Sequence, residues 1–457
     1  MGAVPLVKLI CGRSVISGFQ KVKMGHINMK IRLNRYIWGF IIIICLAIAM
    51  RINDLRVLGY YGDMIGFNAP WAYYIRYWGL FRIYIMSPTT NYPPIFLFIL
   101  DFVSSIVPPY SGRNLQYEFV ILTKLFSVIA EIAFIGIVYI WLPKATSLKW
   151  VIPLLLTIHP GMIMTSANWG QTDSILTLFL VLTIIALNRN QRRMAWIWFA
   201  LTMLMKFQGI VLLPMVGILS LRRFGLRPTI KGFLLGLFVF SAVYAPFILW
   251  SGFDNAMRPF TSAVDLNPVI SANAFNLWYL LTPSIWYFLP NDVRYMPTDT
   301  SRVLGIITLK QVGFLLLGSY VTLVVVFMWR QYIQRREFVW ATALYLAFFM
   351  LPTQIHERYL FPATALSLIA IVQDRRMWFI ALPLMFSFTC NIVALPADHF
   401  IWLGLDLKVM LQGLGLVTAS LNLLCLIGLV WIVIRGKDIT NTDTINMGNL
   451  HPRLETA

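Results

Sequence analysis

The sequence predicts an all-α protein that crosses a membrane many times. Of its 457 residues, 59% are hydrophobic and only 12% are charged, and the mean hydropathy is +0.74. Soluble globular domains contain about 45–50% apolar and about 25% charged residues. Apolar blocks recur along the chain, and about 20 apolar residues make one helical span. The alternation of a transmembrane barrel is missing, so we expect a polytopic helical bundle of about ten to thirteen spans.

The net charge of +19 does not indicate a nucleic-acid-binding protein. Its positive side chains stand in short clusters between apolar blocks, the pattern of the positive-inside rule. We therefore expect the following clusters in the cytoplasm: Arg189/Arg192/Arg193, Arg222/Arg223/Arg227/Lys231, Arg330/Arg335/Arg336, Arg375/Arg376 and Arg435/Lys437. Most acids lie elsewhere and should share the outer face: Asp54, Asp63, Asp173, Asp254, Asp265, Asp292, Asp299, Glu357 and Asp398.

The chain begins with a basic segment, residues 1–35, which has seven Lys or Arg and no acid and is expected in the cytoplasm. The first span, 36–50, has no cleavage site after it and therefore indicates a signal anchor. A long outer loop, 51–117, follows. Within it, stretch 94–109 contains Asp101 and ends in two prolines, which favours an interfacial helix over a span.

Further spans are expected after this loop. Stretch 195–219 has Lys206 in its middle and predicts two short helices with "KFQG" at an outer vertex. Residues 36–434 then form one transmembrane domain, and 435–457 form a cytoplasmic tail. The other spans are expected at 118–142, 150–165, 173–188, 232–250, 303–329, 338–353, 358–373, 376–395 and 407–434.

Polar motifs gather in the segments assigned to the outer face. Asp63 in "YYGDMIGFN" could act as a general base at a cleft, or it could be a solvated loop acid. "NYPPI", which contains Tyr92, shapes the loop or merely starts a helix. "NWGQTDS" holds Asn168, Gln171 and Asp173, which suit sugar hydroxyls, although Asp173 also suits a helix N-terminus.

Cationic groups stand near these motifs. Lys206 interrupts an apolar run, so it should face a polar cavity or snorkel to the surface. In "LPTQIHERYLFP", His356 and Arg358 offer donors for an anionic oxygen and Glu357 could orient either of them. A charged loop tip is the alternative. Glu131, inside a span, is expected to be a buried, paired structural acid.

Together these groups suit a substrate that carries both hydroxyls and a phosphate at the membrane surface. A sugar linked to a lipid phosphate has both properties. No glycine-rich nucleotide loop is present, which disfavours a nucleotide-sugar donor. The four cysteines (Cys11, Cys45, Cys390 and Cys425) are scattered and predict neither a disulfide framework nor a metal site.

The ordered motifs resemble those of the GT-C fold glycosyltransferases, multispan enzymes that use polyprenyl- or dolichyl-phosphate sugars. The likeness is greatest to bacterial and archaeal relatives of the glycosylphosphatidylinositol-anchor mannosyltransferases, and it extends to glucosyltransferases of the endoplasmic reticulum. It covers residues 63 to 362. The matching motifs are Asp63, "NYPPI", "HPGMIMTSANWGQTDSI", "MKFQGIVLLP", "SANAFNLW" and "HERYLFP".

The resemblance implies a role for each matching residue. Asp63 is the general base, and His356, Arg358 and Lys206 bind the lipid phosphate. The sugar or acceptor is bound by Gln171, Asp173, Asn168, Tyr92, Asn276 and Glu357. Two features depart from the family. Asn91 stands where Asp often precedes the Tyr-Pro-Pro motif. The second acid that some relatives have beside the first-loop acid is missing, since Asp54 lies nine residues before Asp63.

We therefore expect an inverting glycosyltransferase, most simply a mannosyltransferase, in the plasma (inner) membrane with both termini cytoplasmic and an outer active site. Its partners would be the bilayer, a polyprenyl-phosphate-sugar donor and a glycan, lipid or protein acceptor, without nucleic acid. No cofactor or metal ligand is assigned, and a divalent cation stays an open alternative. A transporter or flippase of a lipid-linked glycan and a non-catalytic GT-C-like assembly subunit are the other hypotheses.

Overall fold

The computed structural model describes residues 35–57, 61–144, 146–263, 268–282, 298–303, 305–394 and 407–436. These residues form a bundle of α-helices, which confirms the predicted all-α membrane fold class. Two short antiparallel hairpins accompany the helices: β1 (Tyr110–Ser111) with β2 (Asn114–Leu115), and β3 (Arg302–Val303) with β4 (Ile307–Thr308). The predictions for the basic N-terminal segment, the C-terminal tail, Asp265, Asp292 and Asp398 lie outside the described residues.

Seven helices within the described ranges are long and apolar enough to cross a membrane, or eight if one bent pair counts as a span. The chain is therefore a multi-pass membrane protein. Several helices of the expected ten to thirteen spans, such as α9 (Asp173–Asn188) and α17 (Glu337–Met350), are shorter than those seven. The seven are Arg35–Arg56, Tyr117–Trp141, Phe207–Phe224, Leu226–Ser251, Leu309–Gln334, Arg375–Val393 and Gly413–Arg435.

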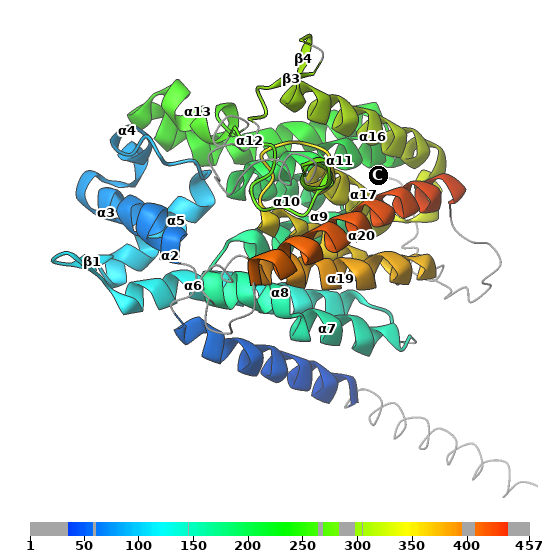
Figure 1. Cartoon of the computed structure of the whole chain (residues 1–457), viewed down its shortest axis with the longest axis horizontal. Coiled ribbons are helices and arrows are strands. Elements are labelled where there is room, and N and C mark those ends of the chain that lie inside the picture. The colour runs from blue at the N-terminus through cyan, green and yellow to red at the C-terminus, as the bar shows by residue number, and fades with distance from the viewer. Residues whose placement is uncertain are drawn as a thin grey trace, which may run out of the picture.

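The predicted first loop folds into a group of short helices at one end of the bundle. Figure 1 shows α3, α4 and α5 together at the left, beside α13 (Phe253–Thr261). The predicted helix within 94–109 is present as α5, which begins at Pro94 and ends at Ile106. The group comprises α2 (Tyr61–Asp63), η1 (Met64–Asn68), α3 (Ala69–Trp78), η2 (Leu80–Arg82), α4 (Ile83–Met86) and α5 (Pro94–Ile106).

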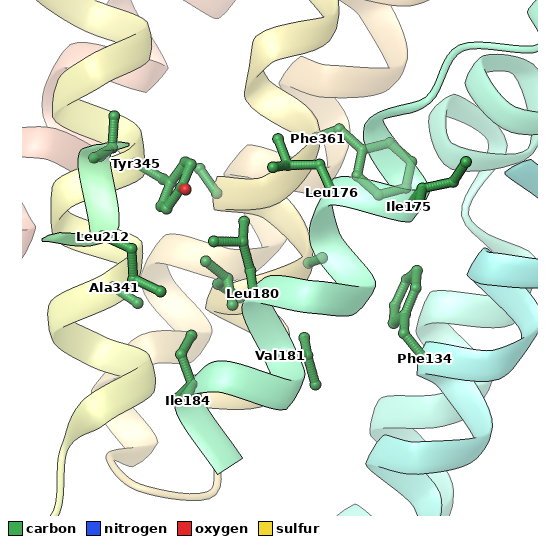
Figure 2. Close-up of a cluster of buried hydrophobic side chains, with 14 of the residues drawn as sticks. Phe134, Ile175, Leu176, Leu180, Val181, Ile184, Leu212, Ala341, Tyr345 and Phe361 are labelled. Carbon is green, nitrogen blue, oxygen red and sulfur yellow. The ribbon is translucent and has the colours of Figure 1, made fainter. Parts of the chain in front are cut away.

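Helix α9 forms the centre of the bundle. Twelve of its 16 residues are buried and none is exposed, as expected of a helix that is apolar on every side. Figure 2 shows Leu176 and Leu180 of α9 between Phe134 of α6 (Tyr117–Trp141) and Tyr345 of α17, with Phe361 of α18 (Phe361–Ala370) above. This packing fixes the start of α9, and with it Asp173, relative to its neighbours.

Two segments break within the bundle, and both breaks lead to the polar motifs. The predicted pair of short helices around "KFQG" is confirmed: α10 (Arg192–Met205) ends at Lys206, and η4 (Phe207–Leu212) and α11 (Leu213–Phe224) follow. The span expected at 150–165 is broken as well. Helix α7 (Leu148–Ile158) and the following helical segment, Pro160–Trp169, meet at His159 with a bend of 51°. Pro160 lacks a backbone N–H and therefore ends the first helix.

The second bend places the "NWGQTDS" motif. After α8 (Pro160–Ile163), the chain continues as the wider turn η3 (Met164–Trp169) and stops at Gly170. Gly170 has a φ of +80°, a left-handed conformation that glycine adopts without steric penalty. A side chain there would also meet Lys124, whose Cγ would lie 2.6 Å from an added Cβ.

Arginines of three basic clusters lie at the end of the bundle opposite to the polar motifs. Arg223 donates to the carbonyl oxygens of Leu187 and Tyr332 and pairs with Glu337 at 2.5 Å. Arg336 and Arg376 share the carboxylate of Asp374. The bundle also contains α12 (Leu226–Ser251), α16 (Leu309–Gln331), η6 (Tyr332–Gln334), η8 (Arg375–Met377), α19 (Trp378–Val393) and α20 (Leu407–Arg435).

Candidate active site

A cavity of about 160 Å³ opens at the end of the bundle away from the arginine clusters. Its wall is formed by the start of α5, the break at Lys206, the ends of α13 and α16, and the loop between α17 and α18. The predicted site residues that line it are Tyr92, Lys206, His356 and Arg358. Three separate segments of the chain thus bring their polar groups to one place.

Asp63 lies beside this cavity without lining it. Its Oδ2 accepts hydrogen bonds from Trp169 Nε1 at 3.1 Å and from Gln171 Nε2 at 2.5 Å. The structure therefore brings two predicted site residues, Asp63 and Gln171, into direct contact across more than 100 positions of sequence. Both bonds use the same oxygen, so Oδ1 is the atom that remains for a further donor.

Lys206 and Asp173 form a buried ion pair. The Lys206 Nζ lies 2.9 Å from Asp173 Oδ2, and both side chains are almost inaccessible to solvent. The ammonium group also lies 5.5 Å from the centre of the Tyr92 ring. Lys206 thus faces a polar cavity, as one of its two interpretations expected, and does not snorkel. Asp173 holds it from behind, because a buried cation is stable only when paired.

The loop that carries His356, Glu357 and Arg358 is held by backbone pairing. The Ala272 N–H donates to the Ile355 carbonyl at 3.0 Å, and His356 forms bridges to Ala272 and Asn273. The "SANAFNLW" segment therefore supports the "HERYLFP" segment directly. Glu357 is buried and pairs with Arg358 at 3.1 Å, while His356 Nδ1 lies 3.9 Å from its carboxylate.

Burial and charge set the protonation of this loop. Burial raises the pKa of Glu357, although the Arg358 guanidinium opposes that effect. Burial also lowers the pKa of His356 well below its usual range, and the cations Arg358 and Lys206 lower it further. Because Glu357 and Asp63 stabilise its charge, the pKa of Arg358 is raised despite its burial. At neutral pH the loop therefore presents a neutral imidazole beside a permanent cation.

Trp169 connects the two halves of the candidate site. The Arg358 guanidinium lies 5.2 Å from the centre of the Trp169 ring, a cation–π contact. The same ring donates its N–H to Asp63. The acid therefore contacts the edge of the indole, and the arginine of the cavity wall lies over its face. Trp169 was not predicted as a site residue, although it stands between Asn168 and Gln171 in the "NWGQTDS" motif.

Other predicted residues lie at different distances from this centre. Asn168 donates to Asp54 at 3.5 Å, next to the Asp63 group. Asn276 caps α14 (Leu277–Leu281) by accepting from the Tyr279 N–H and is not part of the cavity wall. Glu131 is confirmed as a buried, paired acid, because Arg51 binds both of its oxygens, at 2.6 and 2.9 Å.

The cavity also contains groups that sequence analysis missed. Gln208 lines it two residues after Lys206, and Tyr359 follows Arg358 in its wall. Gln354 has a φ of +63° and donates to the buried carboxylate of Asp299 at 2.7 Å, which fixes the loop on the α16 side. All three stand in motifs that the sequence singled out, Gln208 in "MKFQG" and the other two in "LPTQIHERYLFP". Their individual contacts could not be predicted, because those contacts join segments distant in the chain.

In the described ranges, no three His, Cys, Asp or Glu side chains come together as a metal site would need. Comparison with protein-family models gives no match, and comparison with curated proteins gives none either. The likeness to the GT-C glycosyltransferases therefore stays a resemblance of ordered motifs.

Proposed function

We propose that this protein is a membrane glycosyltransferase that transfers a sugar from a polyprenyl-phosphate donor, as its GT-C-like motifs suggest. One observation carries the proposal: Arg358 lies over Trp169, and Trp169 donates to Asp63. A cavity suited to a phosphate thus adjoins a carboxylate suited to a hydroxyl. Three cationic side chains, Lys206, Lys310 and Arg358, line that cavity together with the imidazole of His356.

The chemistry assigned to these groups is an inverting displacement. An acceptor hydroxyl oxygen forms a bond to C1 of the sugar, and the bond from C1 to the lipid phosphate oxygen breaks. The bonding pair leaves with the phosphate, where Arg358 and Lys206 would stabilise the developing negative charge. The hydroxyl proton passes to Asp63 through Oδ1, since Oδ2 already accepts two hydrogen bonds.

The residues that contact Asp63 and Lys206 position these two side chains for the reaction. Gln171 and Trp169 hold the Asp63 carboxylate in one orientation, so that its second oxygen can meet the acceptor. Asp173 keeps the Lys206 side chain ordered when no phosphate is bound. We further propose that the sugar is mannose, that the acceptor is an envelope glycan, lipid or protein, and that the site faces outward from the plasma membrane, because the arginine clusters lie at the other end.

Transport of a lipid-linked glycan is the second candidate, favoured by the two helix breaks, at His159 and at Lys206. Transporters commonly bind substrate at breaks in membrane helices, near the middle of the bilayer. The breaks at His159 and at Lys206 both satisfy the first condition. The polar groups at the cavity, however, all lie toward one end of the bundle, which favours the enzyme.

The test is sugar transfer by the purified protein in lipid. Labelled polyprenyl-phosphate-mannose and polyprenyl-phosphate-glucose are supplied with an envelope extract as acceptor. We expect transfer from one donor by the wild type and a loss of at least about 1,000-fold in Asp63→Asn, because the amide is not a base. The matched control is Asp101→Asn, which changes an acid of α5 that lies outside the cavity.

Two results would count against the proposal. Full transfer by Asp63→Asn would remove Asp63 from the base role. Absence of transfer from both donors by a wild type that still binds them would favour transport or a non-catalytic subunit. Thermal unfolding of both variants, measured alongside, verifies that each one folds.

A further inference from the structure

Gln208 is a polar residue of the cavity wall that has no part in the chemistry described above. Gln208 lines the cavity and is only 7% exposed. Its Oε1 is buried without a hydrogen-bond partner among the described residues. Leaving a buried acceptor unpaired is unfavourable, because the group has lost its hydrogen bonds to water. Because Gln208 also lines the cavity, a ligand bound there can supply the missing partner.

The position of Gln208 is fixed by its own backbone. Its carbonyl oxygen accepts a hydrogen bond from the buried Tyr345 hydroxyl at 3.1 Å. The next residue, Gly209, packs so closely on α10 that an added Cβ would lie 3.0 Å from the Thr202 carbonyl oxygen. The Gly209 N–H also donates to the Lys206 carbonyl at 3.0 Å. The amide of Gln208 is therefore presented from a rigid turn, and not from a mobile loop.

Lys206 and Gln208 belong to the same turn and line the same cavity. Two chain steps of about 3.8 Å keep their Cα atoms within about 7.6 Å of each other. A phosphate bound by Lys206 and Arg358 therefore brings the group attached to it close to Gln208. A side-chain amide offers a donor and an acceptor together, which is what a sugar hydroxyl requires.

We propose that Gln208 is a specificity-determining residue, which hydrogen-bonds a hydroxyl of the donor's sugar while the neighbouring cations hold the phosphate. This inference rests on the proposed function, because it assumes a phosphate-linked sugar in the cavity. It assigns the two parts of the donor to two different groups of side chains. The phosphate belongs to Arg358, His356 and Lys206, and sugar identity belongs to Gln208.

The experiment compares binding of three probes to the full chain in lipid nanodiscs: farnesyl phosphate, farnesyl-phosphate-mannose and farnesyl-phosphate-glucose. The variant is Gln208→Met, which nearly keeps the size of the side chain and removes both the donor and the acceptor of the amide. The matched control is Gln191→Met, which changes an exposed glutamine between α9 and α10. Single deoxy analogues of the preferred sugar probe are then tested on wild type and Gln208→Met.

We expect Gln208→Met to weaken the preferred sugar probe by about fivefold to tenfold, the effect of one hydrogen bond, and to leave farnesyl phosphate unchanged. One deoxy analogue should lose the same factor in the wild type and nothing more in the variant. A variant that merely packs badly would not show this pairing, so the deoxy series separates recognition from folding.

Several results would overturn the inference. If Gln208→Met binds all three probes as the wild type does, Gln208 reads no hydroxyl. If it weakens farnesyl phosphate as much as the sugar probes, it belongs to the phosphate site. If farnesyl phosphate does not bind the wild type at all, the proposed function fails first and the inference falls with it.

Discussion

His356 is a histidine held neutral beside two cations. Its side chain is three-quarters buried, lies 5.4 Å from the Tyr359 ring and has Glu357 as the nearest acid. Burial together with Arg358 and Lys206 lowers its pKa well below 6.5. A neutral ring can donate one hydrogen bond to a phosphate oxygen without adding a third positive charge. This arrangement has a measurable effect on stability.

We expect the free energy of unfolding to decrease as pH falls below about 6.5. The unfolded His356 takes up a proton near its usual pKa, whereas the folded ring resists protonation until a lower pH. The stabilising contribution is therefore complete above pH 6.5 and is lost as pH falls through the folded pKa, by at most about 1.4 kcal/mol per pH unit. Thermal unfolding from pH 7.5 to 5.5 measures it.

The comparison variant for this measurement is His356→Gln, which cannot titrate in that range. Its unfolding temperature should vary less with pH than that of the wild type. Identical pH dependence of the two proteins would show that His356 is not held neutral in the folded state.

At the residue scale, the sequence predicted individual groups better than their partners. Lys206, His356 and Arg358 could be selected because charges are rare in this apolar chain. Trp169 could not, because 16 tryptophans offered no reason to prefer it. The hydrogen bond from Gln171 to Asp63 joins a wide turn to a distant loop, and no local pattern encodes that contact.

At the scale of elements, the short helix η4 sets the position of the cavity's amide and lysine. It packs against α10 through Gly209, where Thr202 leaves no space for a side chain. The absence of a side chain at Gly209 therefore allows the backbone of η4 to pack directly against Thr202 of α10. The consequence is that a single methyl group should disturb both Lys206 and Gln208.

Gly209→Ala should destabilise the protein by about 1–3 kcal/mol, because the added Cβ would lie 2.9 Å from the Thr202 methyl group and 3.0 Å from its carbonyl. Binding of farnesyl phosphate should weaken as well. The control is Gly217→Ala in α11, where nothing lies within 4 Å of an added Cβ and alanine favours a helix by about 0.5–1 kcal/mol. Equal unfolding temperatures for the two variants would contradict this account of η4.

The helices themselves could largely be predicted from the sequence. Expected span 173–188 coincides with α9, and expected span 118–142 differs from α6 by one residue at each end. Long apolar runs between charges make such boundaries clear. The bend at His159 could not be predicted, because a proline alone does not show where a helix breaks. Pro153 lies inside α7 and leaves that helix continuous, whereas α7 ends just before Pro160.

At the scale of the whole molecule, a buried ion pair joins the first span to the rest. Arg51 binds Glu131 of α6 through two hydrogen bonds and donates to the Thr157 carbonyl at 3.1 Å, just before the bend. Ser166 of η3 donates to the same carboxylate. One cluster therefore holds the first span, α6 and both halves of the bent segment together.

Removing one partner should be more damaging than removing both. We expect Glu131→Gln to lower the free energy of unfolding by about 3–5 kcal/mol, because Arg51 stays buried without its counter-charge. The double variant Arg51→Met, Glu131→Met should lose less than the sum of the two single changes. Glu118→Gln, exposed in the first turn of the same helix, should change stability by less than about 0.5 kcal/mol.

Chemical denaturation of the purified protein in detergent measures these differences. An effect of Glu131→Gln no larger than that of Glu118→Gln would mean that the pair does not hold the bundle.

The distribution of charged residues makes the two ends of the bundle different. Arginine clusters close one end of the bundle, and the cavity opens at the other. This separation could be anticipated from the sequence, since basic and acidic residues alternate between successive spans. Which side of the membrane each end faces is part of the proposed function and needs a measurement with separate compartments.

The most direct test is sugar transfer in sealed vesicles that contain the protein in one orientation, with labelled polyprenyl-phosphate-sugar and acceptor supplied on a single face. We expect labelled acceptor and bare lipid phosphate only when both substrates are on the face of the cavity. Intact sugar-linked lipid on the opposite face, without labelled acceptor, would show a transporter and contradict the account.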